Sequence, residues 1–275
     1  MKIYKNKPLY FSKNIPVFSS KDEYITNYEK ICADHVEKIK FENDNPWISN
    51  KVWESMEFST SQLFDKYLSL VGVENPKVLD VGVGLGRLLH SLRTNNAIEA
   101  YGMDIALPYL EIAQKKGIDV CCSKIEDMPY LNDAFDIILC TDVLEHVIDL
   151  NACVTKILSV LKKGGLLIVR VPFKEDLSPY LKDDYPYEYV HLRNFDCTTL
   201  EALFTKIFKH EVLEFKPGLY EARYNWLKYN LPTKHYWRIL HRFITFVSKF
   251  SDDLKEKLVK FLFHPIEINV VIRKV

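Results

Sequence analysis

The sequence predicts an α/β fold in which helices flank both faces of a doubly wound, mostly parallel sheet. Two observations support this prediction. Apolar segments with strand character alternate with helical segments through residues 76–217, and short connections between parallel strands require right-handed crossovers. At the start of this region, the segment 77–89 combines a buried strand, a glycine turn with Gly82, Gly84 and Gly86, and the beginning of a helix.

Residues 1–75 precede the first predicted strand and are expected to form a helical cap. Ser20 and Glu23 have the spacing of a capping box, which predicts a helix start at this point. Apolar side chains follow at helical spacing, at Tyr24, Tyr28, Ile31, Val36 and Ile39. A second helix is expected over about 59–71.

Seven strands are expected in the sheet. They lie near residues 77–81, 99–104, 119–122, 135–140, 165–171, 209–215 and 267–273. Helices separate them, and the helix over 107–116 ends at Gly117, because glycine readily takes the positive φ of a helix C-terminus. Residues 76–217 and 266–275 are therefore expected to form one sheet domain.

Residues 218–265 are expected to form a helical insertion before the last strand. Over 226–265 the insertion has eight Lys and Arg residues against three acidic residues. Its first helix is predicted to place apolar side chains on one side and basic side chains mainly on the other. The apolar set is Tyr236, Leu240, Phe243, Val247 and Phe250, and the basic set is Lys234, Arg238, Arg242 and Lys249. Ser251 is predicted to cap a second helix that Pro265 ends.

The spacing within the glycine turn distinguishes between classes of nucleotide. A dinucleotide-binding fingerprint, G-x-G-x-x-G, needs its third glycine at position 87, where this chain has Arg87. The run is instead D-x-G-x-G-x-G, with Asp80 in the strand two residues before the first glycine. A carboxylate at that position suits a cation or an amino group, so the pattern disfavours a nicotinamide oxidoreductase.

The run from Asp80 to Gly86 resembles motif I of the class I S-adenosylmethionine (SAM)-dependent methyltransferases, whose ligand carries a sulfonium and an ammonium group. The resemblance continues for roughly a hundred residues in the order of that family. Its further parts are an acid-ending strand at 100–105, a segment at 123–130, an Asp-x-Leu-Glu-His run within 135–147, and a Leu-x-x-Gly-Gly entry within 161–172. It implies a Rossmann-like methyltransferase fold, SAM as cofactor and S-adenosylhomocysteine (SAH) as product.

The resemblance also assigns residues to each part of the cofactor. They are Asp80, Gly82, Val83, Gly84 and Gly86 for the methionine moiety, Asp104 and Ile105 for the ribose, Ile125 and Glu126 for the adenine, and Thr141, Asp142 and Val143 beside the cofactor. The chain departs from the family at Lys124, where an acid is usual. Backbone groups or Glu126 are therefore expected to contact the adenine amino group.

Two histidines are candidate catalytic residues. His146 follows the fourth-strand motif, where the acceptor pocket should begin, and His191 lies in a His-x-Arg-x-Phe stretch that resembles related enzymes. A histidine with a pKa near neutrality can accept a proton from an acceptor hydroxyl. A purely structural role remains open for each. The aromatic and acidic segment 183–189 is a candidate wall of the acceptor pocket.

Composition narrows the class of protein. The 275 residues carry 37 basic and 37 acidic side chains, so net charge gives no argument for a nucleic acid partner. No apolar run approaches the roughly 18 residues of a membrane span, and the first residues lack the apolar core of a signal peptide. A cytoplasmic protein is therefore expected. The six cysteines include no Cys-x-x-Cys pair, so we expect reduced thiols and no metal site.

We expect a SAM-dependent methyltransferase that acts by in-line displacement on an oxygen, or a nitrogen, of a small-molecule, glycan or lipid-linked acceptor. The alternative is a non-catalytic SAM-binding or regulatory protein. The N-terminal helices are expected either to cover the cofactor or to pack on the back of the sheet. The insertion is either a lid packed on its own domain or a basic hairpin in which 226–262 contacts an anionic membrane or a lipid-linked acceptor. The sequence predicts no oligomeric state.

Overall fold

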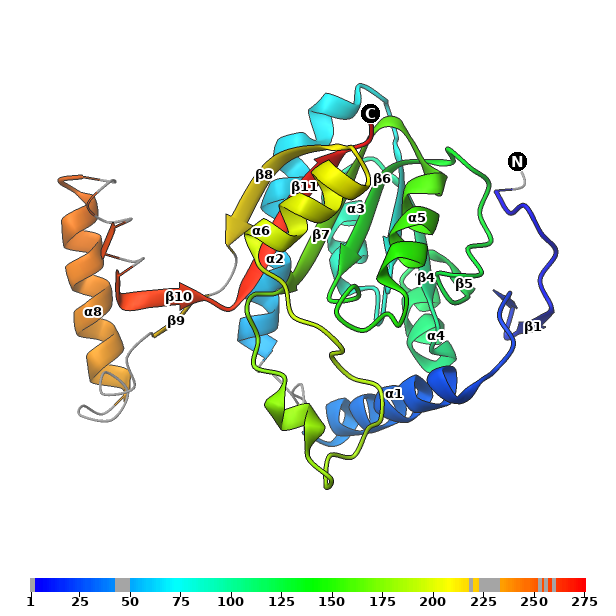
Figure 1. The fold of residues 1–275 in the computed structure, drawn as a ribbon, viewed down its shortest axis with the longest axis horizontal. Coiled ribbons are helices and arrows are strands. Elements are labelled where there is room, and N and C mark those ends of the chain that lie inside the picture. The colour runs from blue at the N-terminus through cyan, green and yellow to red at the C-terminus, as the bar shows by residue number, and fades with distance from the viewer. Residues whose placement is uncertain are drawn as a thin grey trace.

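A computed structural model describes residues 3–42, 50–217, 220–222, 233–251, 254, 257–258 and 261–275 of the chain. Helices cover both faces of a twisted central sheet (Figure 1). Within the described residues this sheet has nine strands. In spatial order they are β1 (Tyr10–Ser12), β2 (Ile15–Val17), β5 (Asp119–Cys122), β4 (Glu99–Asp104), β3 (Lys77–Val81), β6 (Phe135–Thr141), β7 (Leu161–Pro172), β11 (Glu267–Arg273) and β8 (Glu211–Pro217). The predicted doubly wound, mostly parallel sheet is confirmed.

All seven predicted strands are present, with bounds shifted by a few residues. Strands β3 to β7 run parallel to one another, whereas β11 lies antiparallel between β7 and β8. The largest shift is at β7, which begins at Leu161 because that residue pairs with Phe135 of β6. The carboxyl ends of the parallel strands meet at one edge, which is where open α/β sheets bind ligands.

Strands β1 and β2 form a hairpin that the sequence analysis does not predict. Ser12 pairs with Ile15, and the two turn residues Lys13 and Asn14 both have positive φ, 47° and 67°. This two-residue turn has the backbone twist that hairpins favour. Ile15 and Val17 are buried, and Val17 pairs with Cys122, so the hairpin extends the sheet beyond β5.

The longer helices include those predicted, but the second begins nine residues earlier than its predicted start at about residue 59. They are α1 (Glu23–Glu42), α2 (Asn50–Leu68), α3 (Arg87–Asn95), α4 (Leu107–Lys115), α5 (Leu150–Val160) and α8 (Thr233–Ser248). Short helical segments are η1 (Ser69–Val71), η2 (Ser178–Leu181), α6 (Cys197–Glu201) and η3 (Ala202–Ile207). The predicted capping box at Ser20 is wrong. Asp22 directly precedes α1, and its carboxylate accepts a hydrogen bond from the Ile25 N–H at 2.9 Å.

The two N-terminal helices take different positions. α1 packs on α4, at the edge where the parallel strands end (Figure 1). The second half of α2 packs on the sheet, because Leu63 and Phe64 are fully buried in the same apolar cluster as Val78 of β3. The second half of α2 therefore has the expected position on the sheet, while α1 lies at the strand-end edge, and covering of the cofactor by α1 stays a prediction.

The insertion contains α8 and a short antiparallel pair, β9 (Tyr220–Ala222) with β10 (Phe263–Pro265). Figure 1 shows α8 apart from the sheet domain. Ser251 accepts a hydrogen bond from Leu254 N–H at 3.2 Å, as predicted for a helix cap. The second helix ends before Phe263, not at Pro265, because 263–265 pair with β9. Lys228, Asp252, Asp253, Lys255, Glu256 and Lys260 of this insertion lie outside the described residues.

No helix in the described part of the chain combines the length and the apolar composition that crossing a membrane requires.

Candidate active site

A cavity of about 560 Å³ lies at the carboxyl edge of the parallel strands, a size typical of small-molecule sites. It is lined by nearly all the residues that the sequence assigns to the cofactor. These are Asp80, Gly82, Val83, Gly84, Asp104, Ile105, Ile125, Glu126, Thr141, Asp142 and Val143. Four neighbouring strands bring them together, since each group follows the end of β3, β4, β5 or β6.

The glycine turn after β3 holds the backbone close to the end of β6. Gly82 has a φ of 77°, and a Cβ added there would lie 2.3 Å from Cγ2 of Val143. Only glycine fits this position without displacing a neighbour. Gly86 is different: it does not line the cavity, and an added Cβ would meet Ile118 and Ala113 instead. The glycine lets the turn before α3 approach α4 closely, and the contact of Gly86 with the methionine moiety stays a prediction.

Asp104, at the end of β4, holds the turn in place. One carboxylate oxygen accepts a hydrogen bond from Gly84 N–H at 2.9 Å, and the other accepts one from Ala106 N–H at 2.9 Å. Burial raises the pKa of Asp104, and these backbone donors oppose the rise. Each oxygen keeps a further lone pair that can face the cavity.

Asp80 is a buried carboxyl group, 3% exposed, in the wall of the cavity. No hydrogen-bond partner lies within reach of its Oδ1 in the described part of the chain. Burial raises the pKa of Asp80 to about 8, although Arg170 lowers it. A buried acceptor without a partner is costly. The site is therefore suited to a cationic or hydrogen-bond-donating ligand.

Arg170, on β7, is a site residue that sequence reasoning did not identify. Its guanidinium is buried and forms two contacts with the Asp142 carboxylate, and Nη1 donates to Thr60 Oγ1 at 3.2 Å. Asp142 is held by this pair in the left-handed region, at a φ of 56°. A buried arginine within an apolar strand was the available signal, because a charge is rarely buried there without a function or a partner.

Lys124 does not face the cavity as an isolated cation. Its Nζ forms an ion pair with Asp22 at the start of α1, at 2.7 Å. The departure from the family pattern at this position therefore links the loop after β5 to the start of α1. Ile125, 8% exposed, and Glu126 remain in the cavity wall.

Aromatic side chains form the rest of the wall. They come from α1, α2, α4, η2 and the segment between η2 and α6, and are Tyr24, Tyr28, Trp53, Tyr109, Tyr180, Tyr185 and Tyr187. His35 of α1 stacks on Trp53 and shares a 2.6 Å hydrogen bond with the Tyr109 hydroxyl. The sequence analysis proposed only the 183–189 part of this wall, because the other residues match an ordinary buried helix face.

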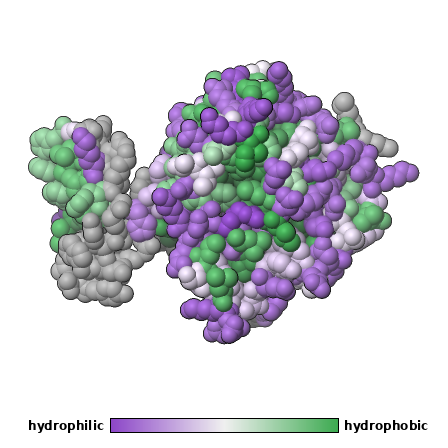
Figure 2. Space-filling model, viewed as in Figure 1, coloured by the Kyte–Doolittle hydropathy of each residue, from purple (hydrophilic) through white to green (hydrophobic). Residues whose placement is uncertain are grey.

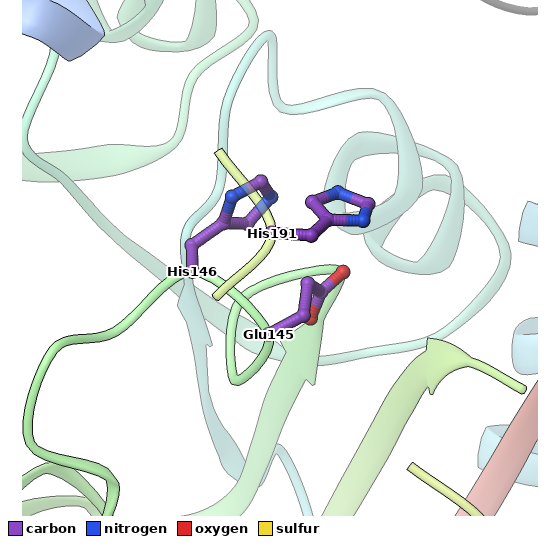
Figure 3. A group of neighbouring side chains, drawn as sticks. All are labelled: Glu145, His146 and His191. Carbon is purple, nitrogen blue, oxygen red and sulfur yellow. The ribbon is translucent and has the colours of Figure 1, made fainter. Parts of the chain in front are cut away.

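Glu145, His146 and His191 also line this cavity. Their side chains lie together (Figure 3). Glu145 is fully buried, and neither of its carboxylate oxygens has a hydrogen-bond partner among the described residues. Burial raises the pKa of Glu145 well above its usual value. Burial, and then the neighbouring His191, lower the pKa of His146 to about 4.

Both histidine rings are held through Nδ1. His146 Nδ1 lies 3.0 Å from the Val190 carbonyl oxygen, which can only accept, so Nδ1 carries the proton. His191 Nδ1 pairs with a Glu175 oxygen, and the other Glu175 oxygen accepts from the Tyr180 hydroxyl at 2.7 Å. The structural role considered for each histidine is thus fulfilled by Nδ1, while Nε2 of each ring makes no hydrogen bond within the described part of the chain.

Comparison with known proteins gives a consistent result for the central segment. A family model described as a methyltransferase domain matches residues 79–169, from β3 to β7. Two uncharacterized proteins of Methanocaldococcus jannaschii are 33% identical over 93 residues and 36% identical over 126 residues. These matches cover 34% and 44% of this chain, and 43% and 54% of the relatives.

A ubiquinone biosynthesis O-methyltransferase of Chromobacterium violaceum is 35% identical over 108 residues, which are 37% of this chain and 45% of that protein. The chain therefore spans about half the length of these relatives.

Two solved structures share the fold over nearly the whole chain. One is a Haloferax volcanii methyltransferase in complex with the Trm112 methyltransferase activator, with a TM-score of 0.56 and 17% identity over 93% of this chain and 99% of that chain. The other is a SAM-dependent methyltransferase of Thermotoga maritima, with a TM-score of 0.54 and 17% identity over 91% of this chain and 99% of that chain.

Proposed function

We propose that the chain transfers a methyl group from SAM to an oxygen of a small-molecule, glycan or lipid-linked acceptor. By its fold and by the methyltransferase domain at residues 79–169, the chain belongs to the class I SAM-dependent methyltransferases. Transfer to a nitrogen is the second candidate. Oxygen comes first because relatives of the central segment include O-methyltransferases.

The observation that carries this proposal is the charge pattern around the glycine turn. Two carboxyl groups, Asp80 and Asp104, flank a turn that has no room for a side chain at Gly82. Asp80 Oδ1 lacks a partner, which fits the ammonium group of SAM, and the remaining lone pairs of Asp104 fit ribose hydroxyls. A pyrophosphate would oppose ionisation of Asp80, whereas an ammonium group favours it, so the pocket fits SAM better than a nicotinamide dinucleotide.

When bound, SAM supplies an electrophilic methyl group on a sulfonium. The residues of the cavity would hold the acceptor atom in line with this methyl group and exclude water. Such positioning can be worth roughly 7–11 kcal/mol of the barrier. Tyr24, Tyr28 and Tyr180 are aromatic walls that fit this role, and the bare Nε2 atoms of His146 and His191 are the groups proposed to act on an acceptor hydroxyl.

Calorimetric titration with SAH, with NAD in a parallel cell, tests the cofactor. Micromolar binding of SAH alone is expected, and binding of NAD, or of neither ligand, contradicts the proposal. Labelled-methyl transfer to pooled hydroxylated and amine acceptors then tests turnover. SAH binding without transfer to any pool would favour the alternative of a non-catalytic SAM-binding protein.

We also propose that α8 lies on an anionic membrane surface. Ile239, Phe243, Phe246 and Phe250 follow one face of the helix and are 62%, 49%, 59% and 74% exposed. Figure 2 shows hydrophobic atoms gathered over α8, apart from the sheet domain. The excess of basic residues over 226–265 favours anionic lipid headgroups.

The lid interpretation has less support. Of the predicted apolar side of α8, Phe243 and Phe250 are exposed, Leu240 is half-buried and Val247 is buried, while the side chain of Tyr236 lies outside the described residues. No residue of α8 is among the described residues that line the cavity.

Co-sedimentation with vesicles tests the membrane contact. The chain should bind vesicles of phosphatidylcholine with phosphatidylglycerol more strongly than phosphatidylcholine alone, and less at high salt. The double variant Phe243→Ser/Phe246→Ser should lose about tenfold in this binding, whereas Phe58→Ser, which changes an equally exposed phenylalanine on α2, should not. Equal binding by the double variant contradicts the proposal. So does a dimer in light scattering that the double variant disrupts, since α8 would then be an interface between copies.

A further inference from the structure

Glu145, His146 and His191 bring three potential metal-ligating side chains to one point of the cavity. Glu145 and His146 follow β6, whereas His191 comes from the segment between η2 and α6 (Figure 3). One ligand atom from each residue lies within 4.8 Å of the other two. Two atoms that bind one Zn²⁺ at about 2.1 Å can be at most about 4.2 Å apart, so only a small side-chain rotation separates this arrangement from a binding geometry.

The hydrogen bonds around the cluster are those that metal-binding histidines need. Each imidazole has its Nδ1 engaged, His146 with the Val190 carbonyl and His191 with the Glu175 carboxylate, and each keeps Nε2 for another partner. Glu175 is itself fixed by the Tyr180 hydroxyl. Carbonyl and carboxylate partners of this kind orient metal-bound imidazoles and set their tautomer.

Glu145 supplies the second, independent observation. Its side chain is fully buried, and both carboxylate oxygens lack hydrogen-bond partners in the described part of the chain. Buried carboxyl oxygens without hydrogen-bond partners are costly, and a cation bound to them would remove that cost. The Arg170 guanidinium makes its hydrogen bonds to Asp142 and Thr60, so it gives neither Glu145 oxygen a hydrogen bond.

We propose that Glu145, His146 and His191 bind a divalent transition-metal ion, with Zn²⁺ the best fit to two imidazoles and one carboxylate. Three protein ligands leave a coordination position open toward the cavity, as in catalytic rather than structural zinc sites. The expectation of no metal site rested on cysteine spacing, and this set contains no cysteine.

The open position suits an oxygen of the acceptor. A metal ion lowers the pKa of a bound hydroxyl or water, and it also fixes the position of the oxygen. The two histidines would then act on the acceptor through the ion instead of accepting its proton. This role rests on the proposed methyl transfer, whereas the metal site itself rests only on the geometry of the cluster.

Metal binding can be measured without turnover. Protein freed of metal by chelation, with any affinity tag removed, is titrated with Co²⁺ by visible absorption and with Zn²⁺ by calorimetry. We expect one ion per chain and the intense visible bands of a low-symmetry Co²⁺ site. The absence of saturable one-to-one binding would overturn the proposal.

Variants identify the ligands. Glu145→Gln and His191→Gln should each weaken Co²⁺ binding at least tenfold, and Glu175→Gln should do so about 10–100-fold by releasing the His191 ring. His90→Gln is the matched control, because His90 is an exposed histidine on α3. Circular dichroism and thermal unfolding check that each variant is folded. Wild-type affinity in folded Glu145→Gln and His191→Gln would show that the ion binds elsewhere and would overturn the assignment.

SAH titration of the same samples separates this proposal from the proposed function. If the chain binds Co²⁺ but does not bind SAH, the metal site is supported and the proposal that SAM is the cofactor is contradicted. If the chain binds SAH but binds neither Co²⁺ nor Zn²⁺, the cofactor is supported and the metal site is contradicted.

Discussion

The part of the cavity proposed to bind SAM (the cofactor half) and the part proposed to bind the acceptor (the acceptor half) are built in different ways. The cofactor half consists of short segments that directly follow β3, β4, β5 and β6, which are neighbours in the sheet. The acceptor half draws on α1, α2 and the segment between η2 and α6, which lie far apart in the sequence. Parallel topology brings strand ends together by itself, whereas the acceptor half depends on tertiary packing.

This difference predicts that substitutions in the two halves affect different measurements. Changes in the cofactor half should alter SAH affinity, and changes in the acceptor half should alter turnover at nearly constant SAH affinity. A single variant that changed both equally would show that the two halves are one coupled unit.

The largest effect is expected for His146→Ala. Loss of this ring removes a group that acts on the acceptor, so turnover should fall about a hundredfold in labelled-methyl transfer. SAH affinity by calorimetry should stay within about twofold, since none of the cofactor assignments includes His146. His90→Ala, on the exposed face of α3, is the control. Unchanged turnover would return His146 to a structural role in the loop after β6.

The second prediction concerns Asp80 and pH. Its pKa of about 8 is raised by burial, so below pH 8 the carboxyl group is mostly protonated. An ammonium group stabilises the ionised form, so SAH binding should release a proton and affinity should increase as pH rises from about 6 to 8. The rise can reach about tenfold per pH unit, because one pKa unit corresponds to 1.36 kcal/mol.

Calorimetry in two buffers of different ionisation enthalpy measures the released proton. Asp80→Asn should bind SAH more weakly and without this pH dependence, while Asp119→Asn, at the start of β5, should keep it. A flat wild-type profile would mean that Asp80 does not contact the ammonium group.

Asp104→Ala should weaken SAH binding at least tenfold, about 1.4 kcal/mol, with the fold intact. It removes the proposed ribose acceptor and also two backbone contacts of the turn. Asp104→Asn separates these effects, because its amide oxygen can still accept from one N–H group. If both variants bind SAH like the wild type, the ribose assignment is lost.

The sequence predicted the sheet, and it predicted which residues after the strands gather around the cavity, because both depend on local patterns. Apolar strands of four to seven residues and the glycine turn are visible in consecutive residues, and sheet topology then brings Asp80, Asp104 and Asp142 to one edge. The hairpin at Lys13 and Asn14 was missed because it lacks the glycine that usually marks such a turn.

The acceptor half could not be predicted in the same way. Tyr24 and Tyr28 have the helical spacing of ordinary buried residues, and nothing local shows that they face a cavity. Glu145 and His191 are 46 positions apart, so their proximity depends on the path of the chain after β7. Arg170 was overlooked because its partners, Thr60 and Asp142, are also distant in sequence.

The last prediction concerns stability and not binding, and it applies where the cofactor half meets the loop that leads to the acceptor half. Gly82 and Gly164 have the same φ, 77°, but a Cβ at Gly82 would lie 2.3 Å from Val143, whereas a Cβ at Gly164 meets nothing within 4 Å. Gly82→Ala and Gly164→Ala therefore share the backbone strain and differ in the clash alone. Urea unfolding should show Gly82→Ala less stable than Gly164→Ala by about 1–3 kcal/mol, the usual cost of overpacking. Equal stability would show that Val143 moves freely, and the turn would then not fix the loop that carries Glu145 and His146.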